Sequence, residues 1–179
     1  MATRRTVICG SPHAGGASQR ACGEAVELLE KRFPGDAVQM IAAGRLGVEG
    51  CVGCDACRDT HRCFRRDAMD GVLEALAASD ELYLAVPVYF AGAPSQFKAV
   101  LDRLQPLYWK WADTPRGDRV PFRPARLMVI GGGGDPHGFE PLVGSVRSAL
   151  AVARFSVERV EASIGDDPRG HIRAWLEAR

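Results

Sequence analysis

The fold can be worked out from the stretch Thr6-Val-Ile-Cys-Gly-Ser-Pro-His-Ala-Gly-Gly-Ala-Ser18, which joins an apolar run to a loop of small residues and then to a helical pattern. Residues 6–9 end at a glycine, which is typical of a strand buried on both faces. After the loop, apolar residues recur at helical spacing at Cys22, Val26, Leu29 and Phe33. A buried strand that leads into a helix begins a βαβ unit, so we expect a parallel sheet.

The same alternation of strand and helix continues along the chain. Strands are expected at residues 6–9, 37–41, 81–86, 126–130 and 155–160. Helical patterns lie around residues 22–33, 69–76, 97–108, 142–153 and 172–176. The second and fifth apolar runs partly alternate with polar residues, as strands at the edges of a sheet do. We therefore expect an α/β protein, a flavodoxin-like three-layer sandwich with a five-stranded parallel sheet in the order 2-1-3-4-5.

The composition is that of an ordinary globular chain. Its 179 residues suit one domain, so we expect a single flavodoxin-like domain over residues 1–179, with a cysteine-rich insertion at about residues 43–66. Lys and Arg number 23 against 22 Asp and Glu, and the net charge of +1 favours no nucleic-acid or anionic-membrane partner. The apolar runs are far shorter than the roughly 20 residues that cross a bilayer. Residues 1–9 hold too short an apolar stretch for a signal peptide, so we expect a cytoplasmic protein.

Residues 10–18 form a glycine- and serine-rich loop that would offer backbone N–H groups and hydroxyls to an anion at a helix N-terminus. The loop is not a Walker A motif, because Gly16 and Ala17 stand where that motif has lysine and a hydroxyl residue. It is not a dinucleotide fingerprint either, because G-x-G-x-x-G is missing and no acidic residue follows Ile41. A mononucleotide phosphate bound without magnesium fits the loop; the alternative is a plain connector with Ser18 as the helix N-cap.

Four of the six cysteines lie close together, with the spacing C-x2-C-x2-C-x5-C, at Cys51, Cys54, Cys57 and Cys63. Two C-x-x-C steps that share a middle cysteine resemble the ligand run of bacterial [4Fe-4S] ferredoxins, and a reducing compartment disfavours disulfides. A zinc site and free or oxidised thiols remain as alternatives. Cys9 and Cys22 lie in apolar stretches and are expected to pack as small hydrophobes.

Charged residues near these motifs are expected at the surface. The insertion carries four arginines, for which solvated surface charge is favoured over docking an acidic electron carrier: Arg58, Arg62, Arg65 and Arg66. Lys98, Asp102 and Arg103 are expected on the exposed face of the third helix, where they would form ion pairs. None of the four histidines sits beside a nucleophile, so we assign no catalytic residue.

Several of these motifs together resemble a known family. They are Ser11-Pro-x-x-x-Gly16-x-Ser18 after the first strand, Pro87-Val-Tyr-Phe-Ala-Gly92 after the third, and then Gln96-Phe-Lys98 and Leu101-Asp-Arg103. In this order they resemble the NADPH-dependent FMN reductase and flavodoxin-like family. The cysteine motif resembles that of its iron-sulfur flavoprotein branch.

The resemblance implies a flavin site. In that family the first loop binds the FMN phosphate and the loop after strand three runs along the isoalloxazine ring. The implied phosphate contacts are Ser11, His13, Gly16, Ala17 and Ser18. The implied ring contacts are Pro87, Val88, Tyr89, Phe90, Ala91 and Gly92, with Tyr89 and Phe90 as a ring-packing wall rather than core aromatics. Both loops follow strands that flank the switch point of the order 2-1-3-4-5, where doubly wound sheets bind ligands.

Two further sets of residues complete the expected site. The glycine run after strand four either approaches the ring through Gly132 and Gly133 or forms a flexible turn. In the iron-sulfur flavoprotein branch the cysteine motif ligates a [4Fe-4S] cluster, which implies metal ligands at Cys51, Cys54, Cys57 and Cys63.

These assignments imply an FMN-dependent redox protein that transfers electrons between a one-electron carrier such as ferredoxin, or NAD(P)H, and a small-molecule acceptor through FMN and a [4Fe-4S] cluster. The alternatives are a cluster-free NAD(P)H-dependent FMN or quinone reductase and a non-catalytic flavodoxin-like electron carrier. NAD(P)H would bind only transiently, because the dinucleotide fingerprint is missing. We also expect a homo-oligomer, in which Trp109 and Trp111 of the irregular segment 109–125 either cover a neighbour's flavin or pack locally.

Overall fold

The computed structural model describes residues 2–177; Met1 and residues 178–179 of the expected domain lie outside this part. Within it, five parallel strands form one sheet in the order β2-β1-β3-β4-β5, which confirms the expected fold and strand order. The strands are β1 (Arg4–Cys9), β2 (Ala37–Ile41), β3 (Glu81–Pro87), β4 (Arg123–Gly131) and β5 (Phe155–Ile164). The α-helices are α1 (Ala17–Arg32), α2 (Cys57–Thr60), α3 (Met69–Ala78), α4 (Ser95–Asp102), α5 (Gln105–Asp113), α6 (Glu140–Val152) and α7 (Ile172–Leu176). Short 3-10 turns are η1 (Ala43–Arg45), η2 (Arg116–Asp118) and η3 (Pro168–His171).

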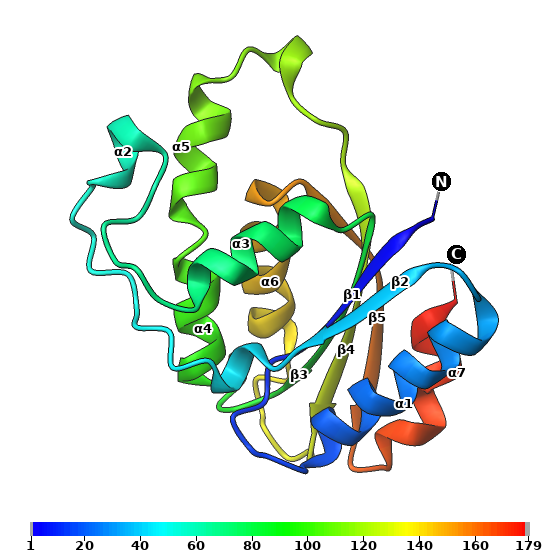
Figure 1. Cartoon of the computed structure of the whole chain (residues 1–179). Coiled ribbons are helices and arrows are strands. Elements are labelled where there is room, and N and C mark those ends of the chain that lie inside the picture. The colour runs from blue at the N-terminus through cyan, green and yellow to red at the C-terminus, as the bar shows by residue number, and fades with distance from the viewer. Residues whose placement is uncertain (1, 178–179) are drawn as a thin grey trace.

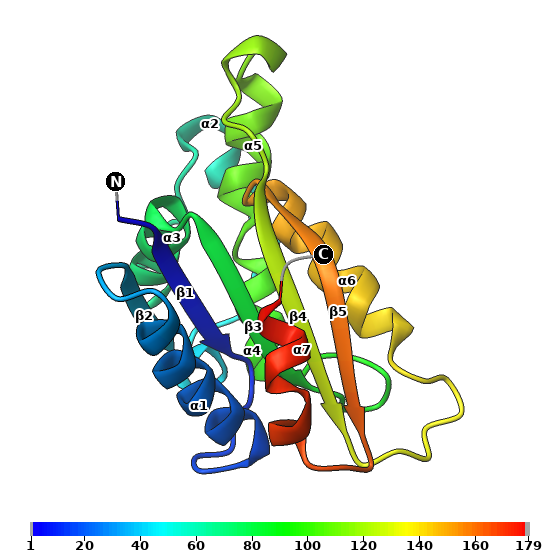
Figure 2. The same cartoon turned by 90° about the vertical axis from the view of Figure 1, so that its right-hand side faces the viewer.

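Helices cover both faces of the sheet (Figures 1 and 2). Leu82 and Leu84 of β3 face a core shared with α3, α4 and α6, whereas Tyr83 and Ala85 face a second core under α1 and α7. Alternate residues of a strand point to opposite faces, so an unbroken apolar run is what a sheet covered on both sides requires. The edge strand β2 is largely exposed, which explains its partly alternating sequence.

The expected helix over residues 97–108 is wrong in one respect, because it divides into α4 and α5 around Arg103 and Leu104. Pro106 explains the division. A proline has no N–H to donate, and its ring clashes with the carbonyl four residues earlier, so the first helix must end. Pro106 instead lies in the first turn of α5, where a missing N–H costs nothing.

The segment 109–125, expected to be irregular, is helical as far as Asp113. Trp109 and Trp111 therefore lie on α5. Trp109 packs locally, with the guanidinium carbon of Arg58 5.1 Å from its ring centroid.

Residues 43–66 contain only η1 and α2 as regular structure. In Figure 1 this segment leaves the end of β2 and passes the helices α4 and α5 before it reaches α3, and α2 packs beside α5. Among residues 2–177, no helix is both long and apolar enough to span a membrane.

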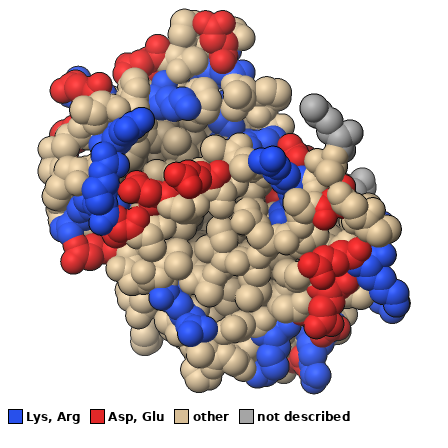
Figure 3. Space-filling model, in the orientation of Figure 1, with Lys and Arg blue, Asp and Glu red and all other residues tan. Residues whose placement is uncertain are grey.

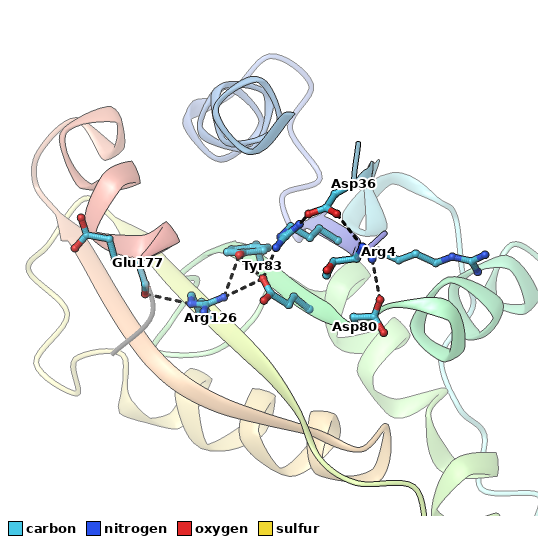
Figure 4. Close-up of polar contacts among 9 residues, drawn as sticks. Arg4, Asp36, Asp80, Tyr83, Arg126 and Glu177 are labelled. Carbon is cyan, nitrogen blue, oxygen red and sulfur yellow. Dashed lines mark hydrogen bonds and ion pairs between the residues drawn. The ribbon is translucent and has the colours of Figure 1, made fainter. Parts of the chain in front are cut away.

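Two arginines are buried in the second core near the amino ends of the strands, Arg5 at 6% and Arg126 at 5% exposure. Figure 4 shows how Tyr83 joins the network: Arg126 Nη1 donates to the Tyr83 hydroxyl at 3.0 Å, and this hydroxyl donates to Glu81 at 2.7 Å. Arg5 Nε donates to Glu81 at 3.2 Å, and Arg5 also pairs with Asp36. Burial and the Glu81 carboxylate raise the pKa of Tyr83 to about 12, so the phenol remains a donor. This network stabilises the sheet at the amino ends of its strands, opposite the end from which loop 10–18 leaves.

Replacing Glu81 by glutamine is expected to lower the free energy of unfolding by about 3 kcal/mol, because it removes the carboxylate that both buried arginines share. Glu30→Gln, on the exposed face of α1, is the matched control and should change it by less than about 0.5 kcal/mol. Urea unfolding followed by circular dichroism measures both. Equal effects of the two substitutions would contradict a structural role for the network.

His171 gives the fold a pH dependence. Its Nδ1 lies 2.8 Å from Glu161 and its Nε2 lies 2.7 Å from Asp166, and these two carboxylates raise the pKa of His171. A histidine whose pKa is raised on folding contributes fully below its unfolded pKa of about 6.5, and the contribution is lost as the pH rises through the folded value. His171→Gln should therefore destabilise the protein by up to about 1 kcal/mol near pH 5.5 and by much less near pH 9. An equal loss of stability at both pH values, measured by urea unfolding, would disprove this.

Candidate functional site

The loop between β1 and α1 presents an uncapped helix N-terminus. Gly16 is the N-cap residue, and within residues 2–177 no side chain caps it. Ser18 lies in the first turn instead, so the alternative of Ser18 as N-cap is wrong. Ser11 is buried, and its Oγ accepts a hydrogen bond from the His13 N–H at 3.2 Å. The first-turn N–H groups of α1 thus remain available to an anion.

Close packing holds this loop at the carboxyl edge of the sheet. The Gly10 N–H donates to the Ala85 carbonyl of β3 at 2.9 Å. A Cβ at Gly44 would lie 2.5 Å from the Gly10 carbonyl oxygen, so only glycine lets η1 approach so near. A Cβ at Gly16 would lie 2.7 Å from Cδ2 of His13, so a side chain at this position would displace the His13 ring.

The loop after β3 is a tight turn with an unusual backbone. Tyr89 and Gly92 exchange two backbone hydrogen bonds, at 2.9 and 3.0 Å. Between them Phe90 and Ala91 have φ angles of 50° and 60°, a left-handed conformation that is unfavourable for residues other than glycine. The side chain of Phe90 is 100% exposed, so Tyr89 and Phe90 are not core aromatics. Strain of this kind concentrates at functional sites.

A cavity of about 240 Å³ lies between this turn and the loop after β4. Val88 and Phe90 line one side, the glycine run 131–134 lines another, and Ile164 at the end of β5 closes it. The structure therefore brings Val88 and Phe90 together with Gly132 and Gly133. The loop 10–18 does not line this cavity, although it follows the strand next to β3.

The four predicted metal ligands line one cavity of about 250 Å³ near the start of α5. Cys57 is buried, Cys63 is partly exposed, and Cys51 and Cys54 are exposed. Burial raises the pKa of the Cys57 thiol, and the charges of the three neighbouring thiols raise it further. Among residues 2–177, no three His, Cys, Asp or Glu side chains converge closely enough to form a metal site.

Arg103 is the residue that sequence reasoning placed wrongly. It is 2% exposed rather than on an open helix face, and it lines the cysteine cavity. Its Nη1 and Nη2 donate to the two Asp67 oxygens at 2.8 and 3.1 Å, and Nη1 also donates to the Glu49 carbonyl at 2.9 Å. Arg103 thus connects residues 43–66, here called the cysteine segment, to the end of α4. Its position three residues after the buried Val100 was the available signal.

The other charged residues predicted at the surface near the cysteines are exposed, except Arg65. Arg65 also lines the cavity and pairs with Glu49, so it is not simply solvated. Figure 3 shows Lys and Arg side chains gathered around α2, where the other three arginines of the insertion are exposed. The exposed ion pair of Lys98 with Asp102, at 2.6 Å, is confirmed. Cys9 and Cys22 are buried in the second core, as expected.

Curated relatives cover part of the chain. An iron-sulfur flavoprotein of Methanosarcina thermophila is 36% identical over 98 residues, which are 55% of this chain and 50% of the relative. An iron-sulfur flavoprotein of Archaeoglobus fulgidus is 32% identical over 135 residues, which are 75% of this chain and 64% of the relative. The match thus spans about half to two thirds of the length of these relatives.

A similar fold occurs in an NAD(P)H:quinone oxidoreductase from Methanothermobacter marburgensis, with a TM-score of 0.66, 16% identity and 100% of both chains covered. A family model described as NADPH-dependent FMN reductase matches residues 3–167. With the strand order and the paired loops at the switch point, this match establishes that the chain belongs to the NADPH-dependent FMN reductase family.

Proposed function

We propose that this protein binds FMN at the carboxyl edge of its sheet and transfers electrons from NAD(P)H or a one-electron carrier to a small-molecule acceptor. Its family supports a flavin-dependent oxidoreductase. The observation that carries the proposal is that the uncapped N-terminus of α1 and the strained turn follow two neighbouring strands, β1 and β3. FMN, when bound, accepts and releases electrons singly or in pairs.

The loop 10–18 would hold the phosphate. The N–H groups of Ala17 and Ser18 begin α1, and the positive end of the helix dipole favours an anion there. The hydroxyls of the buried Ser11 and Ser18 add polar groups that water reaches poorly. His13 is exposed over Gly16 and would cover the phosphate from outside.

The turn after β3 and the glycine run after β4 would hold the flavin ring. Val88 and Phe90 offer apolar surface, and Gly132 and Gly133 let backbone approach a flat ring without side chains between. The left-handed turn is already in place, so its strain need not be generated on binding. Of the same loop, Pro87, Tyr89, Ala91 and Gly92 do not line the cavity and would contact the ring only from its edge.

The cysteine cavity fits an iron-sulfur centre in its chemistry. Cys51, Cys54, Cys57 and Cys63 supply the four thiolates that such a centre requires, all from one segment and facing one cavity. A [4Fe-4S] cluster, when bound, exchanges single electrons. The relatives named iron-sulfur flavoprotein support this part of the proposal.

A cluster-free NAD(P)H-dependent FMN or quinone reductase is the second candidate. One observation favours it: within residues 2–177 the thiols do not converge as a ready-made metal site. In this case the cysteine segment would pack against α4 and α5 without binding a metal. The iron content of the reconstituted protein separates the two candidates.

Gly16→Val is expected to weaken FMN binding at least about tenfold, because a branched side chain at the N-cap would displace His13 and hinder the approach of the phosphate to the first-turn N–H groups. Gly23→Val is the matched control on the same helix, since a Cβ at Gly23 meets nothing within 4 Å. Fluorescence titration of the flavin-free proteins with FMN measures both. FMN affinity unchanged by Gly16→Val would rule out this phosphate site.

Cys57→Ala is expected to lose bound iron and sulfide while it retains FMN, because the cysteine cavity and the carboxyl-edge cavity share no lining residue. It should lose one-electron exchange more severely than direct reduction of the flavin. Cys22→Ala, which removes a cysteine from the second core, should keep both cofactors. Iron, sulfide and flavin analysis after anaerobic reconstitution gives the result. A Cys57→Ala protein with full iron content would refute the ligand assignment.

A further inference from the structure

Two arginines of the cysteine cavity carry buried N–H groups with no acceptor. Among residues 2–177, Nε of Arg103 and Nε of Arg65 are both fully buried and both lack a hydrogen-bond partner. Both residues line the cavity that contains the four thiols. A buried donor without an acceptor costs roughly 1–3 kcal/mol, so two at one cavity require an explanation.

The positive charges of these arginines are already matched. The Arg103 guanidinium is bidentate to Asp67, and the Arg65 guanidinium pairs with Glu49. These contacts use the Nη atoms, and the bidentate contact with Asp67 fixes the guanidinium plane of Arg103. The Nε–H groups are therefore the buried donors of these side chains that an occupant of the cavity could satisfy.

We propose that the Nε–H groups of Arg103 and Arg65 donate hydrogen bonds to the sulfur atoms of a negatively charged metal–thiolate centre held by the four cysteines. The inference rests on the proposed metal site and deepens it. Four thiolates around zinc or around an iron-sulfur core leave net negative charge on sulfur, so both centres share the chemistry that these donors recognise. The apolar Pro106 and the aromatic Phe64 line the same cavity.

These hydrogen bonds would change the reduction potential of an iron-sulfur cluster or the metal affinity of a zinc site. Hydrogen bonds to cluster sulfurs favour the more negative, reduced state and raise the reduction potential. Hydrogen bonds to zinc thiolates stabilise the bound state and tighten metal binding. Arg103 and Arg65 are thus positioning and tuning residues for the metal centre.

The test uses Arg103→Lys and Arg65→Lys in the full-length protein. Lysine keeps the charge but places a methylene where arginine has Nε and one ammonium where arginine has the Nη fork, so each variant removes the proposed donor and loosens the contact with Asp67 or Glu49 while it keeps the charge pair. Arg62→Lys is the matched control, because Arg62 is exposed and does not line the cavity. Arg65 is 28% exposed, so Arg65→Lys should fold even if Arg103→Lys does not.

The primary measurement is the midpoint potential of the cluster after reconstitution with ferrous iron and sulfide. We expect both variants to shift the reduction equilibrium toward the oxidised state by about threefold to tenfold, where tenfold is 59 mV for one electron, and Arg62→Lys to shift it by less than twofold. Shifts in the Arg103→Lys and Arg65→Lys proteins no larger than the control would overturn the inference and leave the cluster assignment intact.

A wild-type protein that takes up no iron-sulfur cluster would refute the cluster part of the proposed function. The inference is then decided with Zn²⁺ alone, by competition against a chelator: the two variants should bind zinc at least about threefold more weakly than Arg62→Lys. Equal zinc affinity of all the proteins, or no metal bound by the wild type in either form, would overturn it.

Discussion

The parallel hydrogen-bonded pairing of β1 with β3 governs the whole site. Cys9 lies opposite Ala85 in this pairing, and the next N–H, of Gly10, still donates to the Ala85 carbonyl at 2.9 Å. Because parallel strands end at the same edge, the loop 10–18 and the turn after β3 must leave the sheet side by side. β3 places Leu82 and Leu84 in one core and Tyr83 and Ala85 in the other, so a shift of its register by one residue would exchange the residues of the two cores.

The cysteine cavity depends on another structural feature, the break between α4 and α5. Pro106 ends the first helix, and the turn that results carries Arg103 into the cavity, where it is 2% exposed. A charge buried to this degree needs a partner, and Asp67 at the far end of the cysteine segment supplies it. Loss of either partner would leave the other charge without compensation, so the segment and the helix pair are held together by this contact.

The sequence predicts the fold well, because its signals are local and repeated. Apolar runs such as residues 81–86 identify the central strands, and the weaker alternation of residues 37–41 identifies an edge. The helix break was missed because the apolar spacing from Phe97 to Tyr108 continues across it, although Pro106 was a visible sign. Strand ends such as Ile164, four residues beyond the apolar run, depend on pairing with β4 and are not encoded locally.

The candidate site was predictable in its backbone elements and less so in its side chains. The glycine and serine loop and the cysteine spacing are read directly from the chain. The left-handed conformation of Phe90 and Ala91 leaves no sign in the residue types, because neither residue favours it. The sequence predicts Arg103 and Arg65 as surface charges, because burial of an arginine depends on a partner distant in sequence, as Asp67 is from Arg103.

The central claim is that the loop 10–18 is a phosphate site serving a flavin, and comparison of FMN with riboflavin tests it most directly. The two ligands share the ring and differ in the phosphate. Titration of the flavin-free protein should give FMN an affinity at least about tenfold higher than riboflavin, or about 1.4 kcal/mol. Equal affinities, or no binding of FMN, would contradict the account.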